Sequence, residues 1–176
     1  MTRNEGIIDC RLIHVQLESR QCPDYCALSY AWGDHALTQP VRINGRWFKI
    51  TENLYDALST LSDLHIYSTT WYWVDAICIS HSDDLEKGIQ VSQMGTIFGQ
   101  CERVVAWTGP EGDDSEEALD FIQLLSYGYN SVEDLEEWLR RLVRKEEYRF
   151  MWSSLDRLLG RPWWRRAWIL QECIIR

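Results

Sequence analysis

Alternating apolar and polar positions predict strands in the first half of the chain. Ile13, Val15 and Leu17 alternate with polar residues over 13–18, which is the period of a strand with one wet face. The run 25–30 predicts a second strand, short and largely apolar. Within 41–50, an Asn-Gly pair separates two alternating runs, which predicts a two-residue β-hairpin.

The hairpin is followed by a change to helical spacing. Thr51 is placed to cap a helix whose apolar stripe has the spacing of one helix face. The stripe comprises Leu54, Ala57, Leu58 and Leu61. Asn53 falls in the first turn of this helix, where side chains and free N–H groups can meet an anion.

The most apolar run, 71–79, predicts a central strand covered on both faces. Asp75 lies inside it, and a buried charge must be paired or hydrogen-bonded, so it is either a structural anchor or a functional group. Asp83 and Glu86 have capping-box spacing and predict the start of a helix. The positions expected to face inward on that helix are Leu85, Ile89, Met94, Ile97 and Phe98. The run 103–107 predicts a further short buried strand.

The last third of the chain is predicted to be helical. One helix runs from Ser115 to Gly128, the next begins with a capping box at 131–134, and a third covers about 148–159. On the second, one side is formed by Leu135, Trp138, Leu139, Leu142 and Val143.

A final helix is predicted from Pro162 onward, because proline suits the first turn of a helix. On it, Glu172 shares a face with Trp168 and Ile169, and a carboxylate held against such groups is a candidate for bond-making chemistry. The structural alternative is an ordinary helical ion pair between Glu172 and Arg176.

Strands that alternate with helices over the first two thirds predict an α/β fold. We expect a mainly parallel central sheet flanked by helices, with an inserted β-hairpin and a helical C-terminal third. The length of 176 residues corresponds to a single domain, 1–176. Because the last residues stop within a predicted helix that has no cap, we expect the chain to be the N-terminal part of a longer protein.

Composition narrows the classes of function. The formal charge of −9 argues against broad binding of nucleic acid, although the arginines concentrated in the last third are compatible with a local anion site. The six cysteines form no Cys-x-x-Cys pair, so we expect no metal site and a reduced, cytoplasmic compartment. Neither a secretory signal nor an apolar run of membrane-spanning length is evident. The ten tryptophans provide flat, rigid surfaces for stacking or for a partner.

Six runs of residues together resemble one family. They are Tyr25-x-Ala-Leu-Ser-Tyr-x-Trp-Gly33, Ile50-Thr-x-Asn-Leu-x-x-Ala-Leu58, Trp73-Val-Asp-Ala-Ile-Cys-Ile79, Asp83-x-x-Glu-Lys87 with Gln90, Val91 and Met94, Val104-Val-x-Trp107, and Arg161-Pro-Trp-Trp-x-Arg-x-Trp-Ile-x-Gln-Glu172. Over 25–172 the chain resembles the fungal heterokaryon incompatibility (HET) domain. The resemblance implies a module of non-self recognition that triggers cell death, usually beside flanking regulatory domains. The chain departs from the family pattern at Ser80-His81, where Asn-Gln is usual, and at Thr108, where Leu is common.

The HET domain is in turn similar to TIR domains, and the likeness rests on two short runs. Leu28-Ser-Tyr-x-Trp32 is similar to the first TIR strand and loop, and Trp168-Ile-Leu-Gln-Glu172 to the TIR helix that carries the catalytic glutamate of NAD⁺ cleavage. This resemblance implies that Glu172 is catalytic and that NAD⁺ is a substrate, with no prosthetic group. The residues expected to bind the nucleotide are Ser29, Tyr30, Trp32, Gly33, Asp34, Asn53, Asp75, Trp164, Arg166 and Trp168.

One carboxylate can suffice for this chemistry, because nicotinamide is already a cationic leaving group and the oxocarbenium-like state needs a nearby negative charge. Arg165 or Arg166 could bind the pyrophosphate, although helical arginines are more often surface charges. Two other classes of function stay open. The chain could be a non-enzymatic signalling module that self-associates through its tryptophans, or an unrelated hydrolase or nucleotide binder. Whether the chain is an NAD⁺-cleaving enzyme or a signalling module, we expect it to form a homo-oligomer on activation.

Overall fold

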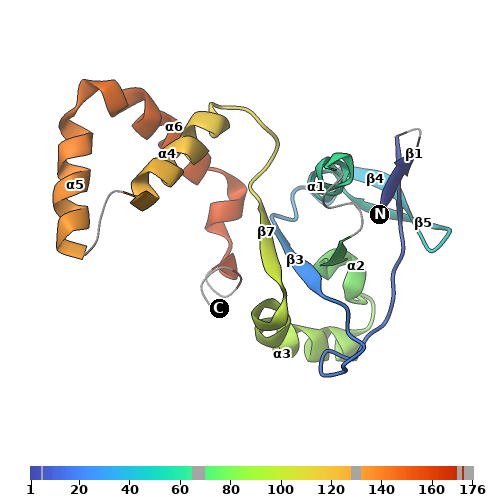
Figure 1. The fold of residues 1–176 in the computed structure, drawn as a ribbon. Coiled ribbons are helices and arrows are strands. Elements are labelled where there is room, and N and C mark those ends of the chain that lie inside the picture. Colours follow the sequence, from blue (N-terminus) through green and yellow to red (C-terminus); the bar gives the residue numbers. More distant parts are fainter. Residues whose placement is uncertain (5, 65–69, 128–131, 170–171, 173–176) are drawn as a thin grey trace. The chain divides into compact units, whose positions relative to one another are not determined.

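The computed structural model describes residues 1–4, 6–64, 70–127, 132–169 and 172, and the chain forms two compact units (Figure 1). Unit 1 comprises Met1–Gly109 and Arg165–Arg176, and it contains all the strands among the described residues. Unit 2, Pro110–Trp164, is helical and is inserted in the sequence of unit 1. The chain is therefore a mixed α/β protein.

A three-stranded parallel sheet forms the centre of unit 1. Strand β3 (Tyr25–Tyr30) lies between β6 (Trp71–Trp73) and β7 (Arg103–Trp107), and Figure 1 shows β3 and β7 side by side. The run 25–30 is thus confirmed as a strand, and the structure shows it to be almost entirely buried. The prediction that 71–79 is the central strand is wrong, because β6 stops at Trp73 and lies at an edge. The rest of that run begins with a short helix, α2 (Asp75–Cys78), and a short apolar run does not distinguish these two outcomes.

A second sheet has the strand order β1-β2-β4-β5. Its members are β1 (Thr2–Asn4), β2 (Ile7–Cys10), β4 (Thr38–Ile43) and β5 (Arg46–Thr51). The hairpin between β4 and β5 is confirmed: Asn44 and Gly45 have φ of 50° and 78°, as a two-residue turn of this kind requires.

The strand predicted at 13–18 is absent from this described part of the chain. The side chain of Asn44 accepts a hydrogen bond from the backbone N–H of Leu12 (3.0 Å) and donates one to its carbonyl oxygen (2.9 Å). These bonds occupy the backbone that a continuing strand would need for its ladder. Turn hydrogen bonds follow instead, from the N–H of Ser19 to the carbonyl of Gln16 and from the N–H of Cys22 to the carbonyl of Ser19.

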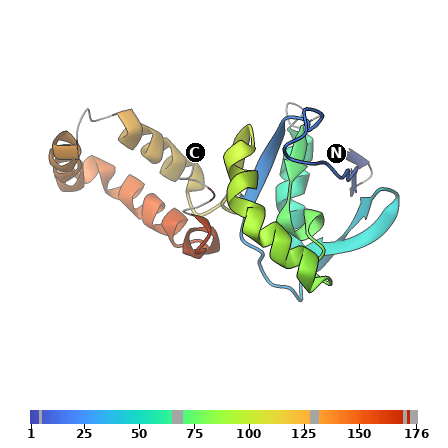
Figure 2. The same ribbon diagram turned by 90° about the horizontal axis from the view of Figure 1, so that it is seen from below.

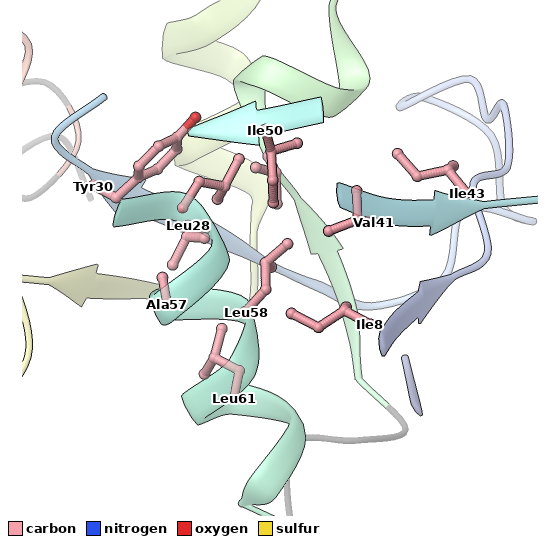
Figure 3. Packing of buried hydrophobic residues seen from close by; sticks show 11 residues of the cluster. Ile8, Leu28, Tyr30, Val41, Ile43, Ile50, Ala57, Leu58 and Leu61 are labelled. Carbon is pink, nitrogen blue, oxygen red and sulfur yellow. The ribbon is translucent and has the colours of Figure 1, made fainter. Parts of the chain in front are cut away.

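The main core lies between the parallel sheet, helix α1 (Glu52–Asp63) and the second sheet. The predicted apolar stripe of α1 is confirmed as buried. Figure 3 shows how the α1 side chains pack against Leu28 and Tyr30 of β3 and against apolar residues of the hairpin. Since side chains alternate along a strand, the opposite face of β3 presents Ala27, which packs against helix α3 (Asp84–Gln100). Helices α1 and α3 therefore cover opposite faces of the parallel sheet (Figure 2).

Helix α3 begins as predicted, with the Asp83 carboxylate accepting hydrogen bonds from the N–H groups of Leu85 and Glu86. Met94, Ile97 and Phe98 are buried, also as predicted. The inward placement of Leu85 and Ile89 is wrong, since both are exposed. The step of five residues from 89 to 94 turns a helix by about 140° beyond one full turn. Leu85 and Ile89 therefore cannot lie on the same face as the three buried residues.

Unit 2 contains helices α4 (Ser115–Tyr127), α5 (Val132–Arg144) and α6 (Arg149–Leu159), with the short 3₁₀ helix η1 (Glu146–Tyr148) and all but the last residue of the 3₁₀ helix η2 (Pro162–Arg165). Its core is Phe121, Leu142 and Leu155, lined by further aromatic side chains. The inward placement of Val143 on α5 is wrong, because this residue is exposed. Among the described residues of both units, every helix is too short or too polar to cross a membrane.

Candidate functional site

Strands β3 and β7 end at the same level, and the loops that follow the parallel strands form what we call the carboxyl edge of the sheet. In the β3–β7 register Tyr30 pairs with Trp107. Asn53, at the start of α1, links the two strand ends: its amide nitrogen donates to the carbonyl of Ala31 (2.5 Å), and its oxygen accepts from the Trp107 indole N–H (3.0 Å). Asn53 therefore holds the backbone of the loop that follows β3.

The loop after β3 depends on a glycine at one position. Gly33 has φ of 75°, and a Cβ atom built there would lie 3.2 Å from the Cβ of Asn53. A side chain would be strained by the backbone conformation and crowded by α1. Asp34 then accepts a hydrogen bond from the N–H of Ala36 (2.9 Å), which closes the turn.

Asp75 organises the neighbouring part of the edge. Its carboxylate accepts hydrogen bonds from the Trp32 indole N–H (2.7 Å) and from the N–H of Ala76 (2.7 Å). Burial, together with the nearby Asp75 charge, raises the pKa of the Tyr30 hydroxyl well above its ordinary value. Asp75 is expected within a strand, but it lies in the first turn of α2. There the backbone N–H of Ala76 and the indole N–H of Trp32 stabilise its carboxylate.

The Trp32 ring is half-buried and contacts two imidazoles. His35 and His81 contact it in T-shaped geometry, with ring centroids 5.4 Å and 5.0 Å away. The His81 ring also lies 3.3 Å from the backbone oxygen of Asp75. His81 is one of the residues that depart from the sequence pattern described above, and in this chain it adds an aromatic contact to Trp32.

The helix predicted from Pro162 to Glu172 is not continuous. The 3₁₀ helix η2 ends at Arg165, and the backbone leaves helical geometry at Arg166. Glu172 is again helical, and its N–H donates to the carbonyl of Trp168 (2.9 Å). This break changes which side chains accompany Glu172.

Glu172 is buried at the end of β3 and bound by two residues. Arg166 binds it in bidentate fashion, with Nη2 2.8 Å from Oε1 and Nη1 2.9 Å from Oε2. The Ser29 hydroxyl donates to Oε2 and also accepts a hydrogen bond from Arg166 Nη1 (3.2 Å). The Glu172 side chain is 1% exposed and that of Arg166 is 18% exposed. The expected partner Arg176 lies outside the described residues, and the observed partner is Arg166.

Most of the predicted site residues therefore meet at the carboxyl edge, as Ser29, Tyr30, Trp32, Gly33, Asn53, Asp75, Arg166 and Glu172 do. Trp168 is joined to Glu172 through the backbone, and about half of its surface is exposed. Trp164 belongs to unit 2. Sequence reasoning missed Trp107 and His35, although the position of Trp107 at the end of a parallel strand could have indicated it.

A cavity of about 220 Å³ lies in another part of unit 1. Its walls come from the N-terminal segment, α1 and the β6–α2 region, and include Cys10, Leu12, Leu58, Trp71 and Ile77. Neither Ser29 nor Glu172 lines it. This cavity is therefore separate from the carboxyl-edge cluster.

The fold and the cluster define a class: an α/β protein with a buried carboxylate at the carboxyl edge of a parallel sheet. The heterokaryon incompatibility (HET) family matches residues 25–172, and the chain belongs to this family. It is similar to heterokaryon incompatibility protein 6, OR allele, of Neurospora crassa, with 31% identity over 186 aligned residues. The match covers 85% of this chain but 27% of the relative, so the chain spans little more than a quarter of that protein. No solved structure matches the chain.

Proposed function

We propose that this chain is a cell-death-inducing module of fungal non-self recognition and that it acts by cleaving NAD⁺ to nicotinamide and ADP-ribose products. Membership of the HET family and the similarity to the Neurospora heterokaryon incompatibility protein support the first part. The second part rests on the likeness to TIR domains carried by 28–32 and 168–172. A TIR-like, flavodoxin-like arrangement of the sheet belongs to the same proposal.

The observation that carries the enzymatic proposal is the position of Glu172. The C-terminal segment brings this carboxylate to Ser29, 143 residues earlier in the chain, at the end of a parallel strand. Ligands of open α/β sheets bind outside the carboxyl ends of the strands. A carboxylate at this edge is in the right region to stabilise the oxocarbenium-like state and to hold ribose hydroxyls.

In the proposed reaction each named residue has one task. Glu172 is the catalytic residue, and Arg166 binds the pyrophosphate. The Ser29–Asp34 loop forms one wall of the nucleotide site, with Trp32 and Trp168 as stacking surfaces. Asn53 and Asp75 hold that wall through the hydrogen bonds described above. The active form is a homo-oligomer in the cytoplasm, governed by domains beyond this chain.

A second function is favoured by the same cluster. Both oxygens of Glu172 are bound by Arg166, and one of them also by Ser29, as in a structural ion pair. If this arrangement is permanent, the chain is a non-enzymatic signalling module that triggers death by self-association. Exposed tryptophans such as Trp47 would then be typical interface anchors.

Nicotinamide release separates the two functions. Purified, oligomeric protein is incubated with NAD⁺, and nicotinamide is measured for the wild type and for Glu172→Gln. Glu137→Gln, on the exposed surface of α5, is the matched control. The enzymatic proposal expects turnover in the wild type and in the control and none in Glu172→Gln. It fails if an assembled, cell-killing form releases no nicotinamide, or if Glu172→Gln retains full turnover.

A further inference from the structure

We infer that Arg166 is a latch on Glu172, which a ligand carrying a diphosphate opens by taking the place of the carboxylate on the guanidinium. The inference rests on the proposed nucleotide site and deepens it. Arg166 would both select ligands that carry a diphosphate and, on binding them, expose Glu172. The described state of the carboxyl edge is then the closed, resting state.

Burial shows why a latch is needed. With a side chain only 1% exposed, Glu172 cannot touch a ribose hydroxyl in the described arrangement. Its Oε1 is bound by Arg166 Nη2, and its Oε2 by Arg166 Nη1 and by the Ser29 hydroxyl. Contact with any ligand therefore requires these bonds to break first.

The chemistry of Arg166 indicates what can break them. A guanidinium presents two parallel N–H groups that fit a carboxylate or a phosphate in the same bidentate geometry. A diphosphate carries more negative charge than the single carboxylate and competes for the same donors. The Arg166 side chain is 18% exposed, so part of it faces solvent, whereas Glu172 is closed off.

Two arginines that precede Arg166 in the sequence have different bonds. Arg161 donates to the carbonyl oxygens of Pro110 (3.0 Å) and Gly112 (2.5 Å) in unit 2. Arg157 binds Asp114 and the carbonyl of Asp113, also in unit 2. Arg166 is held at the carboxyl edge by groups that a ligand can replace.

Ser29 holds the closed state from the strand. Its hydroxyl lies between the two charged groups, donating to Glu172 and accepting from Arg166 at 3.2 Å. When the guanidinium turns to a diphosphate, the hydroxyl can keep its bond to the carboxylate. Ser29 is thus a positioning residue that retains Glu172 at the end of β3 after the latch opens.

The latch makes an unusual prediction for the variant that removes the charge of Glu172. Glu172→Gln, which the enzymatic proposal expects to abolish turnover, should bind ADP-ribose about tenfold more tightly, because Arg166 is then free of its competing anion. Nicotinamide riboside, which has no phosphate, should show no gain. Calorimetric titration of the purified chain measures both affinities, and inorganic pyrophosphate serves as a third probe.

Two further variants test the role of Arg166. Arg166→Gln combined with Glu172→Gln keeps the site neutral and should lose the tightened binding of ADP-ribose and pyrophosphate. Ser29→Ala loosens the closed state while keeping the ion pair, and it should tighten ADP-ribose binding about two- to threefold. Ser29→Ala also keeps the latch testable if Glu172→Gln does not fold.

The outcomes separate the latch from the enzyme. Tighter ADP-ribose binding by Glu172→Gln supports the latch even if the wild type releases no nicotinamide, in which case the enzymatic proposal fails alone. Nicotinamide release with unchanged or weaker ADP-ribose binding in folded Glu172→Gln and Ser29→Ala overturns the latch alone. An equal gain in affinity for nicotinamide riboside also overturns it, because the selection would not then depend on phosphate.

Discussion

Two regions of this chain each contain an ion pair between an arginine and a glutamate, one exposed to water and the other buried. On α5, Glu137 and Arg141 lie one helical turn apart and form an ion pair with about 70% of each side chain exposed. At the carboxyl edge, Arg166 and Glu172 form a bidentate pair in which the carboxylate is 1% exposed. The first pair costs little to form and stabilises little, because water screens it. The second has lost its hydration, so each charge depends on the other.

On the surface of α5 a charged side chain can do without its ion-pair partner, whereas at the carboxyl edge it cannot. On α5 a lost partner is replaced by water. At the carboxyl edge a lost partner leaves a buried charge alone, so substitutions there should have large effects that disappear when both partners are changed. Stability measurements on three sets of variants sharpen or break this distinction.

The largest effect is expected from Arg166→Gln. Among the described residues it leaves the buried Glu172 carboxylate with the Ser29 hydroxyl as its hydrogen-bond partner, and breaking a buried pair from one side costs about 3–5 kcal/mol. Urea unfolding should show this loss as a lower midpoint at an unchanged slope. The double variant Arg166→Gln with Glu172→Gln should recover most of the loss, because no buried charge is left unpaired. A double variant as unstable as the single one would mean that the packing of Arg166, rather than the charge, holds the edge.

The sequence predicts the members of this buried pair but not their pairing. Glu172 and Ser29 are both indicated by motifs, and Arg166 by its charge, yet a regular helix from Pro162 would pair Glu172 with Arg176. The backbone break at Arg166 decides the partner. No local pattern announces that break, because the contact that accompanies it is with Ser29, which lies on a strand 137 residues earlier than Arg166.

Elsewhere the same division between local and distant causes holds. The Asn44-Gly45 hairpin and the α1 stripe are set by neighbouring residues, and both are confirmed. The strand predicted at 13–18 does not form: the backbone of Leu12, just before it, is hydrogen-bonded to the distant Asn44 side chain, and a turn bond from Ser19 to Gln16 follows. The central strand was misplaced because an apolar run suits either a buried strand or a buried helix.

An intermediate effect is expected from Asn53→Ala. It removes the acceptor of the Trp107 indole N–H and the donor to the Ala31 carbonyl, and an unsatisfied buried group costs about 1–3 kcal/mol. Ser62→Ala is the matched control on the same helix, since the Ser62 hydroxyl donates within its own turn, to the carbonyl of Ser59. Its loss should stay below about 0.5 kcal/mol. If urea unfolding shows similar losses in the free energy of unfolding for the two variants, the link that Asn53 makes between the strand ends does not stabilise the fold.

The smallest effect is expected on α5, from Arg141→Gln. This variant removes the partner of Glu137 one turn away, but the carboxylate stays in water, which hydrates it as well as the guanidinium did. The melting temperature should not move measurably at physiological salt, whereas Arg166→Gln lowers it by many degrees under the same conditions. A drop for Arg141→Gln comparable to that for Arg166→Gln would show that the exposed face of α5 is covered in solution. In that case both ion pairs would be shielded from water, and burial would not distinguish them.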